Sequence, residues 1–256
     1  MHYRLIITIE ELNKEHITCR ISHEQDILLR YYLEERRIEP QEQNETSLLI
    51  KKFKKQFQKV MHSALHGTVE PGHRISCVFI DDFPFLKEED YGRFILMDRR
   101  EDLKISVGDE ALRKGDKLFA DGSFMDEKGR AGYGGFIEDG QGRREDYFGS
   151  FDSGSSNLME LIGVSEGLER LKESRTIQIN TDSRFVIRGL VQWVHFWRYN
   201  EWQTAYGRAV RYAEHWQKAD ALCEGKLIQF NWIKGHSGHE EQDYCHRLAQ
   251  NAVLNQ

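Results

Sequence analysis

Three carboxylates between residues 117 and 256 stand where burying an acid costs free energy unless it binds a cation. Asp121 interrupts the apolar run LFADGSF, Glu160 is flanked by apolar residues in NLMELIGV, and Asp182 ends the strand-like run IQINTD. Burying a carboxylate costs free energy unless it is paired or coordinates a metal ion. A fourth feature, GHSG at 235–238, adds His236. Each feature alone is compatible with a cap or a turn, but together they predict one site for a hard cation.

Such a site suits the hydrolysis of a phosphodiester. A phosphodiester hydrolase must activate water, neutralise the charge that develops around phosphorus and stabilise the leaving oxygen. Two Mg²⁺ ions about 4 Å apart can perform all three tasks when the scissile phosphate bridges them. Mg²⁺ prefers oxygen ligands, and bound metal offsets the repulsion that raises the pKa values of clustered carboxylates.

The elements that must position these acids follow from hydrophobic periodicity. Strands are predicted over Lys117–Phe124, Ala131–Glu138, Arg143–Gly149, Thr176–Thr181 and Leu227–Ile233. Helices are predicted over Asn157–Lys172 and Ser183–Trp193, onward through Leu222, and over Glu240–Leu254. This order predicts a mixed central sheet flanked by helices, in which the ends of the elements that carry the acids lie close together.

Four ordered motifs in this region resemble the type 1 ribonuclease H family. They are DGSF (121–124), SSNLMELIGVSEGLERL (155–171), NTDSRFVIRGLVQWVHFW (180–197) and WIKGHSGHEEQDYCHRLA (232–249). The resemblance covers roughly residues 117–254 and implies an α/β, ribonuclease H-like fold with a five-stranded mixed sheet flanked by helices. It also implies metal-dependent, sequence-independent endonucleolytic hydrolysis of the RNA strand of an RNA·DNA hybrid.

The resemblance also implies roles for individual residues. Asp121, Glu160 and Asp182 match ligands of two Mg²⁺ ions, with Asp121 bridging the ions. His236 matches a residue assigned to proton transfer or product release, a task that suits an imidazole because imidazoles titrate near neutral pH. Three residues match a phosphate pocket and a base-contact segment: Ser155, Ser156 and Asn157.

The stretch from Arg184 to Arg211 matches the basic protrusion with which the family grips the DNA strand. It contains five arginines, interleaved aromatic residues and Glu201 as its one acid. Arginine–phosphate contacts supply salt-sensitive affinity without sequence preference. Trp193 is expected to pack against a deoxyribose, where a 2′-hydroxyl would interfere. Composition alone fits equally well a helix pair that buries its aromatic side chains.

One position departs from the family pattern. Where the last helix usually carries a fourth aspartate, this chain has His246 in YCHRLA. Imidazole suits Mg²⁺ poorly but is acceptable to Mn²⁺, so Mn²⁺ is a possible substitute. We expect His246 to complete the metal site, with Asp243 on the same helical face as the alternative.

His246 also keeps two other functions open. One is a hybrid-binding module with weakened catalysis, and the other is a nuclease of the same fold that acts on another nucleic acid. Three intact acids together with His236 favour the hybrid endonuclease.

Composition and hydrophobic pattern limit the classes of protein to which the chain can belong. The 256 residues carry a net charge of −6 and contain no apolar run near the ~20 residues that cross a bilayer. The start, MHYRLIITIEEL, meets charge too early for a signal peptide, so we expect a cytoplasmic protein without a membrane segment. Residues 1–110 are predicted to form a small α+β domain and residues 111–256 the catalytic domain.

The predicted first domain contains no recognisable chemistry. Its predicted strands are Tyr3–Ile9, Ile17–Ser22 and Arg74–Ile80, and its predicted helix is Thr46–Leu65. Binding of the hybrid, binding of a protein partner and assistance in folding are all compatible with this composition.

Overall fold

The computed structural model describes residues 1–65, 69–81, 83, 85–100, 115–126, 129–235 and 237–254. These residues form two compact units. Unit 1 comprises Met1–Pro84 and His195–Arg211, and unit 2 comprises Phe85–Val194 and Tyr212–Gln256. The domain boundary predicted at residue 110 lies outside the described residues.

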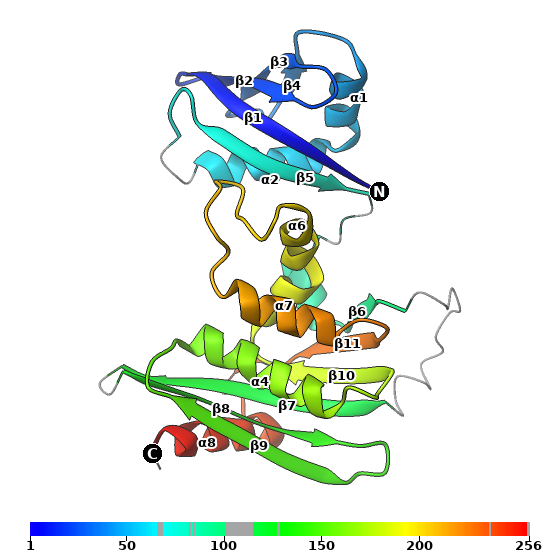
Figure 1. Ribbon diagram of the computed structural model, residues 1–256, viewed down its shortest axis with the longest axis vertical. Helices are drawn as coiled ribbons and strands as arrows, with labels where there is room; N and C mark the ends of the chain where they lie inside the picture. Colours follow the sequence, from blue (N-terminus) through cyan, green and yellow to red (C-terminus); the bar gives the residue numbers. More distant parts are fainter. Residues whose placement is uncertain are drawn as a thin grey trace. The chain divides into compact units, whose positions relative to one another are not determined.

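Unit 1 is an antiparallel sheet with helices on one face (Figure 1). Its strand order is β4-β3-β2-β1-β5. The strands are β1 (His2–Leu12), β2 (His16–Ser22), β3 (Ile27–Tyr32), β4 (Ile38–Pro40) and β5 (Arg74–Ile80). The helices are α1 (Glu45–Lys52) and α2 (Lys54–Leu65), so the single predicted helix is interrupted at Phe53. Alternate residues of each long strand, such as Leu5, Ile7 and Ile9, are fully buried in the core of this unit.

The segment 195–211 is built into unit 1. Asn200 is 1% exposed, and the Ser76 hydroxyl donates to its Oδ1 at 2.7 Å. The backbone N–H of Ser76 on β5 donates to the carbonyl of Ala205 at 2.9 Å. Phe196 and Tyr206 pack against the core of unit 1. Since an uncovered edge strand exposes unpaired backbone groups, this segment protects the free edge of β5.

Unit 2 contains a six-stranded mixed sheet with the order β6-β11-β10-β7-β8-β9. The strands are β6 (Ile95–Asp98), β7 (Asp116–Met125), β8 (Arg130–Glu138), β9 (Arg144–Phe151), β10 (Thr176–Thr181) and β11 (Leu227–Trp232). The five predicted strands are thus confirmed, and β6 is an additional edge strand that pairs antiparallel with β11.

The helices of the second half of the chain follow the predicted order with one exception. They are α4 (Ser156–Arg170), α5 (Arg184–Arg188), the π-helical turn η3 (Gly189–Trp193), α6 (Val194–Tyr199), α7 (Ala213–Leu222) and α8 (Glu240–Leu254). The helix expected to continue through Leu222 is wrong for residues 200–212, which are mainly turns. Among the described residues, no helix combines the length and apolar character needed to cross a bilayer.

The arrangement of β7, β10 and β11 brings the predicted acids together. These strands are parallel, and Asn180 of β10 lies opposite Phe119 of β7. Two residues further along, Asp182 and Asp121 therefore reach the same edge of the sheet, which is where open sheets hold ligands. Helix α4 packs on one face of β7 and α8 on the other (Figure 1).

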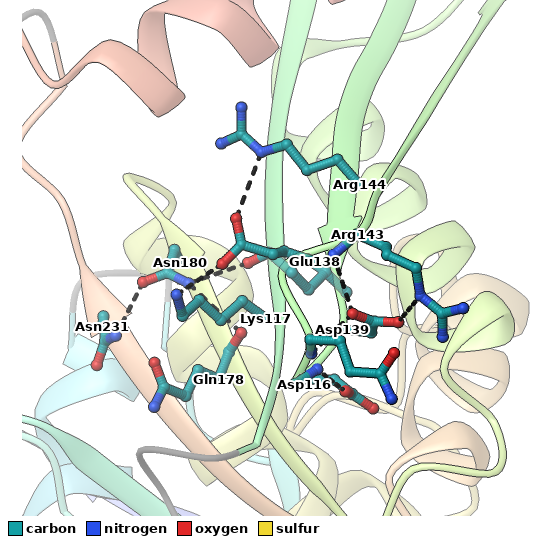
Figure 2. A network of polar contacts seen from close by, with 12 residues as sticks. Asp116, Lys117, Glu138, Asp139, Arg143, Arg144, Gln178, Asn180 and Asn231 are labelled. Carbon is teal, nitrogen blue, oxygen red and sulfur yellow. Dashed lines mark hydrogen bonds and ion pairs between the residues drawn. The ribbon is translucent and has the colours of Figure 1, made fainter.

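Side chains also tie these strands together (Figure 2). Asn231 donates to Asn180 Oδ1 at 2.8 Å, and Asn180 donates to the carbonyl of Leu118 at 3.3 Å. Lys117 of β7 forms an ion pair with Glu138 of β8 at 2.7 Å. These contacts join four neighbouring strands and reinforce the register that places the acids level with one another.

Replacing Asn200 with alanine should destabilise unit 1. Besides the Ser76 contact, its Nδ2 donates to the carbonyls of Gln203 and Thr204 at 2.9 and 3.3 Å. Because these groups lose a buried hydrogen-bond partner, we expect the free energy of opening of the β5 amides to fall by about 1–3 kcal/mol. Native-state hydrogen exchange measures this, and Arg208→Ala on the same segment is the exposed control. Equal protection in both variants would contradict the role assigned to Asn200.

Candidate metal centre and its surroundings

Asp121 and Glu160 are brought together by the glycine that follows Asp121. A Cβ atom at Gly122 would lie 2.5 Å from the backbone nitrogen of Glu160, which is closer than real contacts allow. Glycine at this position lets α4 lie directly on β7. The backbone N–H of Gly122 also donates to Asp121 Oδ1 at 2.8 Å. The DG pair therefore supplies both the acid and the space for the second acid.

Asp182 is held by side chains from two other elements, β11 and α8. The indole Nε1 of Trp232 donates to its backbone carbonyl at 2.9 Å, and Gln242 Nε2 of α8 donates to its Oδ1 at 3.2 Å. A Cβ at Gly235 would lie 2.7 Å from its Oδ2, so a larger residue there would force the carboxylate to shift. The side chain of Asp182 is thus oriented before any ion binds.

The three acids form one compact group. Asp121, Glu160 and Asp182 each offer a ligand atom, and these atoms all lie within 4.8 Å of one another. Burial, helped by the negative charges of Asp182 and Asp121, raises the pKa of Glu160 to about 7, although a hydrogen bond from Ser183 opposes the shift. A divalent cation would offset this repulsion, and the all-oxygen donor set suits a hard ion such as Mg²⁺. The residues present therefore fit a metal centre.

His246 contacts the metal centre through Asp121. Its Nδ1 lies 2.8 Å from Asp121 Oδ2, and its side chain is 35% exposed. Among the described residues, the group of mutually close ligand atoms does not include His246 or Asp243. Direct ligation by His246 stays a prediction. His236 lies outside the described residues, so its predicted role in proton transfer also stays a prediction.

The predicted phosphate pocket lies at the start of α4. Ser155 is the N-cap residue, and its Oγ accepts a hydrogen bond from the backbone of Leu158 at 3.2 Å. The same Oγ lies 2.9 Å from the hydroxyl of Tyr212. Ser156 and Asn157 are exposed in the first turn. Tyr212 has a φ of 62°, a left-handed conformation that is strained for tyrosine, and no local sequence signal predicts its place beside Ser155.

Arg184 and Trp193, both predicted to contact nucleic acid, have protein partners in the structure. The guanidinium of Arg184 lies 4.1 Å from the ring centroid of Trp232, and its Nη1 lies 2.5 Å from a Glu88 oxygen. Trp193 is half-buried and packs edge-on against Phe185, with ring centroids 5.7 Å apart. Their contacts with nucleic acid stay predictions.

The supporting side chains were not predicted from the sequence. Gln242, Trp232 and Ser183 orient the acids through the hydrogen bonds described above. Ser183 is the exception that carried a local signal, because a serine directly before a helix commonly caps it. Gln242 carries no such signal, since only the packing of α8 on the sheet brings it to Asp182.

Comparison with known proteins assigns the second part of the chain to a family. A family model described as RNase H matches residues 113–254, more than half of the chain. Ribonuclease H of Escherichia coli (strain K12 / DH10B) and that of Shigella boydii serotype 18 are each 35% identical over 139 residues, 54% of this chain and 89% of the relative.

The solved structures include an enzyme described as LC9-RNase H1, a type 1 RNase H with the type 2 active-site motif. It is 29% identical, with a TM-score of 0.49 over 55% of this chain and 72% of that chain. LC11-RNase H1, solved in complex with RNA/DNA hybrid, is 16% identical, with a TM-score of 0.41 over 55% of this chain and 97% of that chain. On the family match and the identity to curated relatives, this chain belongs to the ribonuclease H family.

Proposed function

We propose that this chain is a divalent-metal-dependent endonuclease that hydrolyses the RNA strand of RNA·DNA hybrids without sequence preference. The observation that carries the proposal is the convergence of Asp121, Glu160 and Asp182 within 4.8 Å in a member of the ribonuclease H family. Cleavage of a labelled hybrid in Mg²⁺ and in Mn²⁺ tests it directly. Binding of the hybrid without cleavage in either metal would instead favour the weakened binding module.

The acids and their partners have separable tasks. Asp121, Glu160 and Asp182 would hold two Mg²⁺ ions, or Mn²⁺ in their place; when bound, such ions neutralise a transferring phosphate and lower the pKa of water. Gln242 and Trp232 keep Asp182 oriented, and Ser183 keeps Glu160 directed at the site. This pre-orientation reduces the reorganisation needed when the substrate arrives.

Hybrid binding is proposed for the residues around the metal centre. Ser155, Ser156 and Asn157 lie at the N-terminus of α4, where backbone N–H groups favour a phosphate. Arg184 and Trp193 would contact the opposite strand. Recognition through phosphates and 2′-hydroxyls rather than base edges accounts for cleavage without sequence preference.

Neutralising any one of the three acids should abolish hydrolysis. Asp121→Asn, Glu160→Gln and Asp182→Asn each remove a charge that holds the ions, so we expect cleavage rates to fall at least about 100-fold, beyond the usual effect of an outer-shell residue. The matched control is Asp126→Asn, an exposed acid just beyond the end of β7. Full activity in Asp121→Asn would contradict the mechanism.

Glu160→Gln should stabilise the metal-free protein at pH values above the pKa that this glutamate has in the unfolded chain. Its pKa of about 7 exceeds the value near 4.3 of an unfolded chain, so the stabilising contribution of the protonated form is present at low pH and is lost as pH rises toward 7. Glutamine avoids that loss. We expect a gain on the order of 3 kcal/mol at pH 8 and little change at pH 4.

Urea unfolding in the presence of a chelator measures this difference. Repeating it with saturating Mg²⁺ is the control, because bound metal stabilises the ionised wild-type site and should reverse the order of the two proteins. A gain that is equal at both pH values would show that Glu160 ionises as it does in an unfolded chain.

His246→Asp should strengthen Mg²⁺ binding. An aspartate at this position would add negative charge beside Asp121, whereas the imidazole supplies none when neutral. We expect the Mg²⁺ concentration that gives half-maximal cleavage to fall several-fold and the preference for Mn²⁺ over Mg²⁺ to shrink. Metal titrations of both proteins measure this. Unchanged titrations would show that His246 is only a hydrogen-bond partner of Asp121.

A further inference from the structure

Residues 85–100 precede the matched family region at 113–254, yet they are an integral part of unit 2. β6 extends the sheet by pairing with β11, with Ile95 opposite Phe230. Arg99 forms an ion pair with Asp220 of α7, and both side chains are less than 10% exposed. The backbone N–H of Arg99 also donates to the carbonyl of Lys226 at 2.9 Å. The segment is therefore anchored after β6 by a buried charge pair.

The other end of the segment places Tyr91 in a cluster of side chains next to the acids. Tyr91 lies in the short 3-10 helix η1 (Glu88–Gly92) and is 3% exposed. Its hydroxyl accepts a hydrogen bond from Arg188 Nε at 2.7 Å. Its ring meets that of Trp232 edge-on, with centroids 6.0 Å apart, and the Arg184 guanidinium lies 4.7 Å from its ring centroid. Tyr91 thus contacts three side chains that the family region supplies.

Two of these three residues bond to the same atom of a proposed metal ligand. The indole Nε1 of Trp232 donates to the backbone carbonyl of Asp182 at 2.9 Å, and the backbone N–H of Arg184 donates to it at 3.1 Å. The Arg184 guanidinium also lies over the Trp232 ring at 4.1 Å. Trp232 and Arg184 therefore determine where the backbone of Asp182 lies, and Tyr91 packs against both.

We propose that Tyr91 is a positioning residue for Asp182, supplied by a segment outside the family match. It acts through Trp232, because it holds the indole, both directly and through the Arg184 guanidinium stacked on the same ring, in the orientation that keeps the Asp182 carbonyl bonded. Stacked cationic and edge-on aromatic contacts restrict ring orientation in this way. The proposal rests on the proposed function, in which Asp182 is a metal ligand.

Loss of the Tyr91 ring should weaken metal binding more than it weakens the fold. Mutating a residue that orients a metal ligand typically lowers metal affinity about 10–100-fold. We therefore expect Tyr91→Ala to raise the Kd for Mn²⁺ about tenfold. Tyr91→Phe keeps the ring and loses only the Arg188 hydrogen bond, so it should restore most of the affinity. Phe94→Ala, two residues after η1 and 69% exposed in the wild type, is the matched control.

The experiment is a calorimetric titration of the metal-free, 256-residue chain with Mn²⁺ in the absence of nucleic acid. Thermal unfolding is recorded for each variant to establish that it is folded at the titration temperature. Wild-type Mn²⁺ affinity in folded Tyr91→Ala would overturn the proposal. An equal loss of affinity in Phe94→Ala would also overturn it, because the effect would then belong to the whole segment.

Trp232→Phe provides a second, independent test. It keeps an aromatic ring and removes the Nε1 donor, so it should also raise the Mn²⁺ Kd. Combined with Tyr91→Ala, the loss should be smaller than the product of the two separate losses, because both changes act on the same hydrogen bond. Independent, multiplicative effects would show that Tyr91 does not act through Trp232. This test remains decisive if Tyr91→Ala is poorly folded, since Tyr91→Leu, which also removes the ring, can be paired with Trp232→Phe in its place.

Failure of this proposal and failure of the proposed function are distinguishable. If wild-type protein binds Mn²⁺ but does not cleave the hybrid, the proposed function fails while the Tyr91 effect on metal binding is still measurable. If wild-type protein cleaves the hybrid and the Tyr91 variants bind Mn²⁺ as wild type does, only the positioning role fails. Cleavage assays at saturating Mn²⁺ complete the comparison, because a role in metal positioning lowers kcat there without changing the KM for the hybrid.

Discussion

The repulsion among three carboxylates held within 4.8 Å of one another is the constraint on which the catalytic unit depends. Such a group is unfavourable without a cation, because burial and like charge both oppose ionisation. The surrounding structure must therefore force the acids together. Gly122 allows α4 to approach β7, and Gly235 allows the loop after β11 to pass Asp182. The clustered acids destabilise the metal-free fold locally, and the packing of helices on the parallel strands offsets this cost.

The acids are held by side chains from elements that are distant along the chain. Asp182 is bonded by Trp232 at the end of β11 and by Gln242 of α8, and Glu160 is bonded by Ser183. The edge strand β6 and η1 add Tyr91 behind Trp232. An arrangement of this kind keeps the ligand oxygens convergent in the metal-free protein, so binding of the ions requires little rearrangement.

The aromatic and basic segment 195–211 is part of the fold of unit 1, a structural role that its composition did not reveal. Phe196 and Tyr206 pack against the core of unit 1, and Asn200 bonds to Ser76 of β5. These two aromatic side chains are thus packed on the core of unit 1, whereas the alternative suggested by composition was a pair of helices burying them between each other. Any contribution of this segment to hybrid affinity is thereby linked to the folding of unit 1, because the same residues complete its sheet edge.

The sequence by itself determined the order of strands β7 to β11, the main helices between and after them, and the three acids as candidate ligands. Those features are local: period-two and period-3.6 patterns record which face of each element is buried, and an acid inside an apolar run is recognisable without its neighbours. The motifs around Asp121, Glu160 and Asp182 were sufficient to identify the family.

Only the tertiary structure decided how the remaining residues serve the site. The bond between His246 and Asp121, the position of Gln242 and the contact of Tyr91 with Trp232 each join residues more than 50 positions apart. The pairing of β6 with β11 and the inclusion of 195–211 in unit 1 are likewise long-range. Local periodicity contains no information on which buried face meets which, because that choice is made by packing the whole chain.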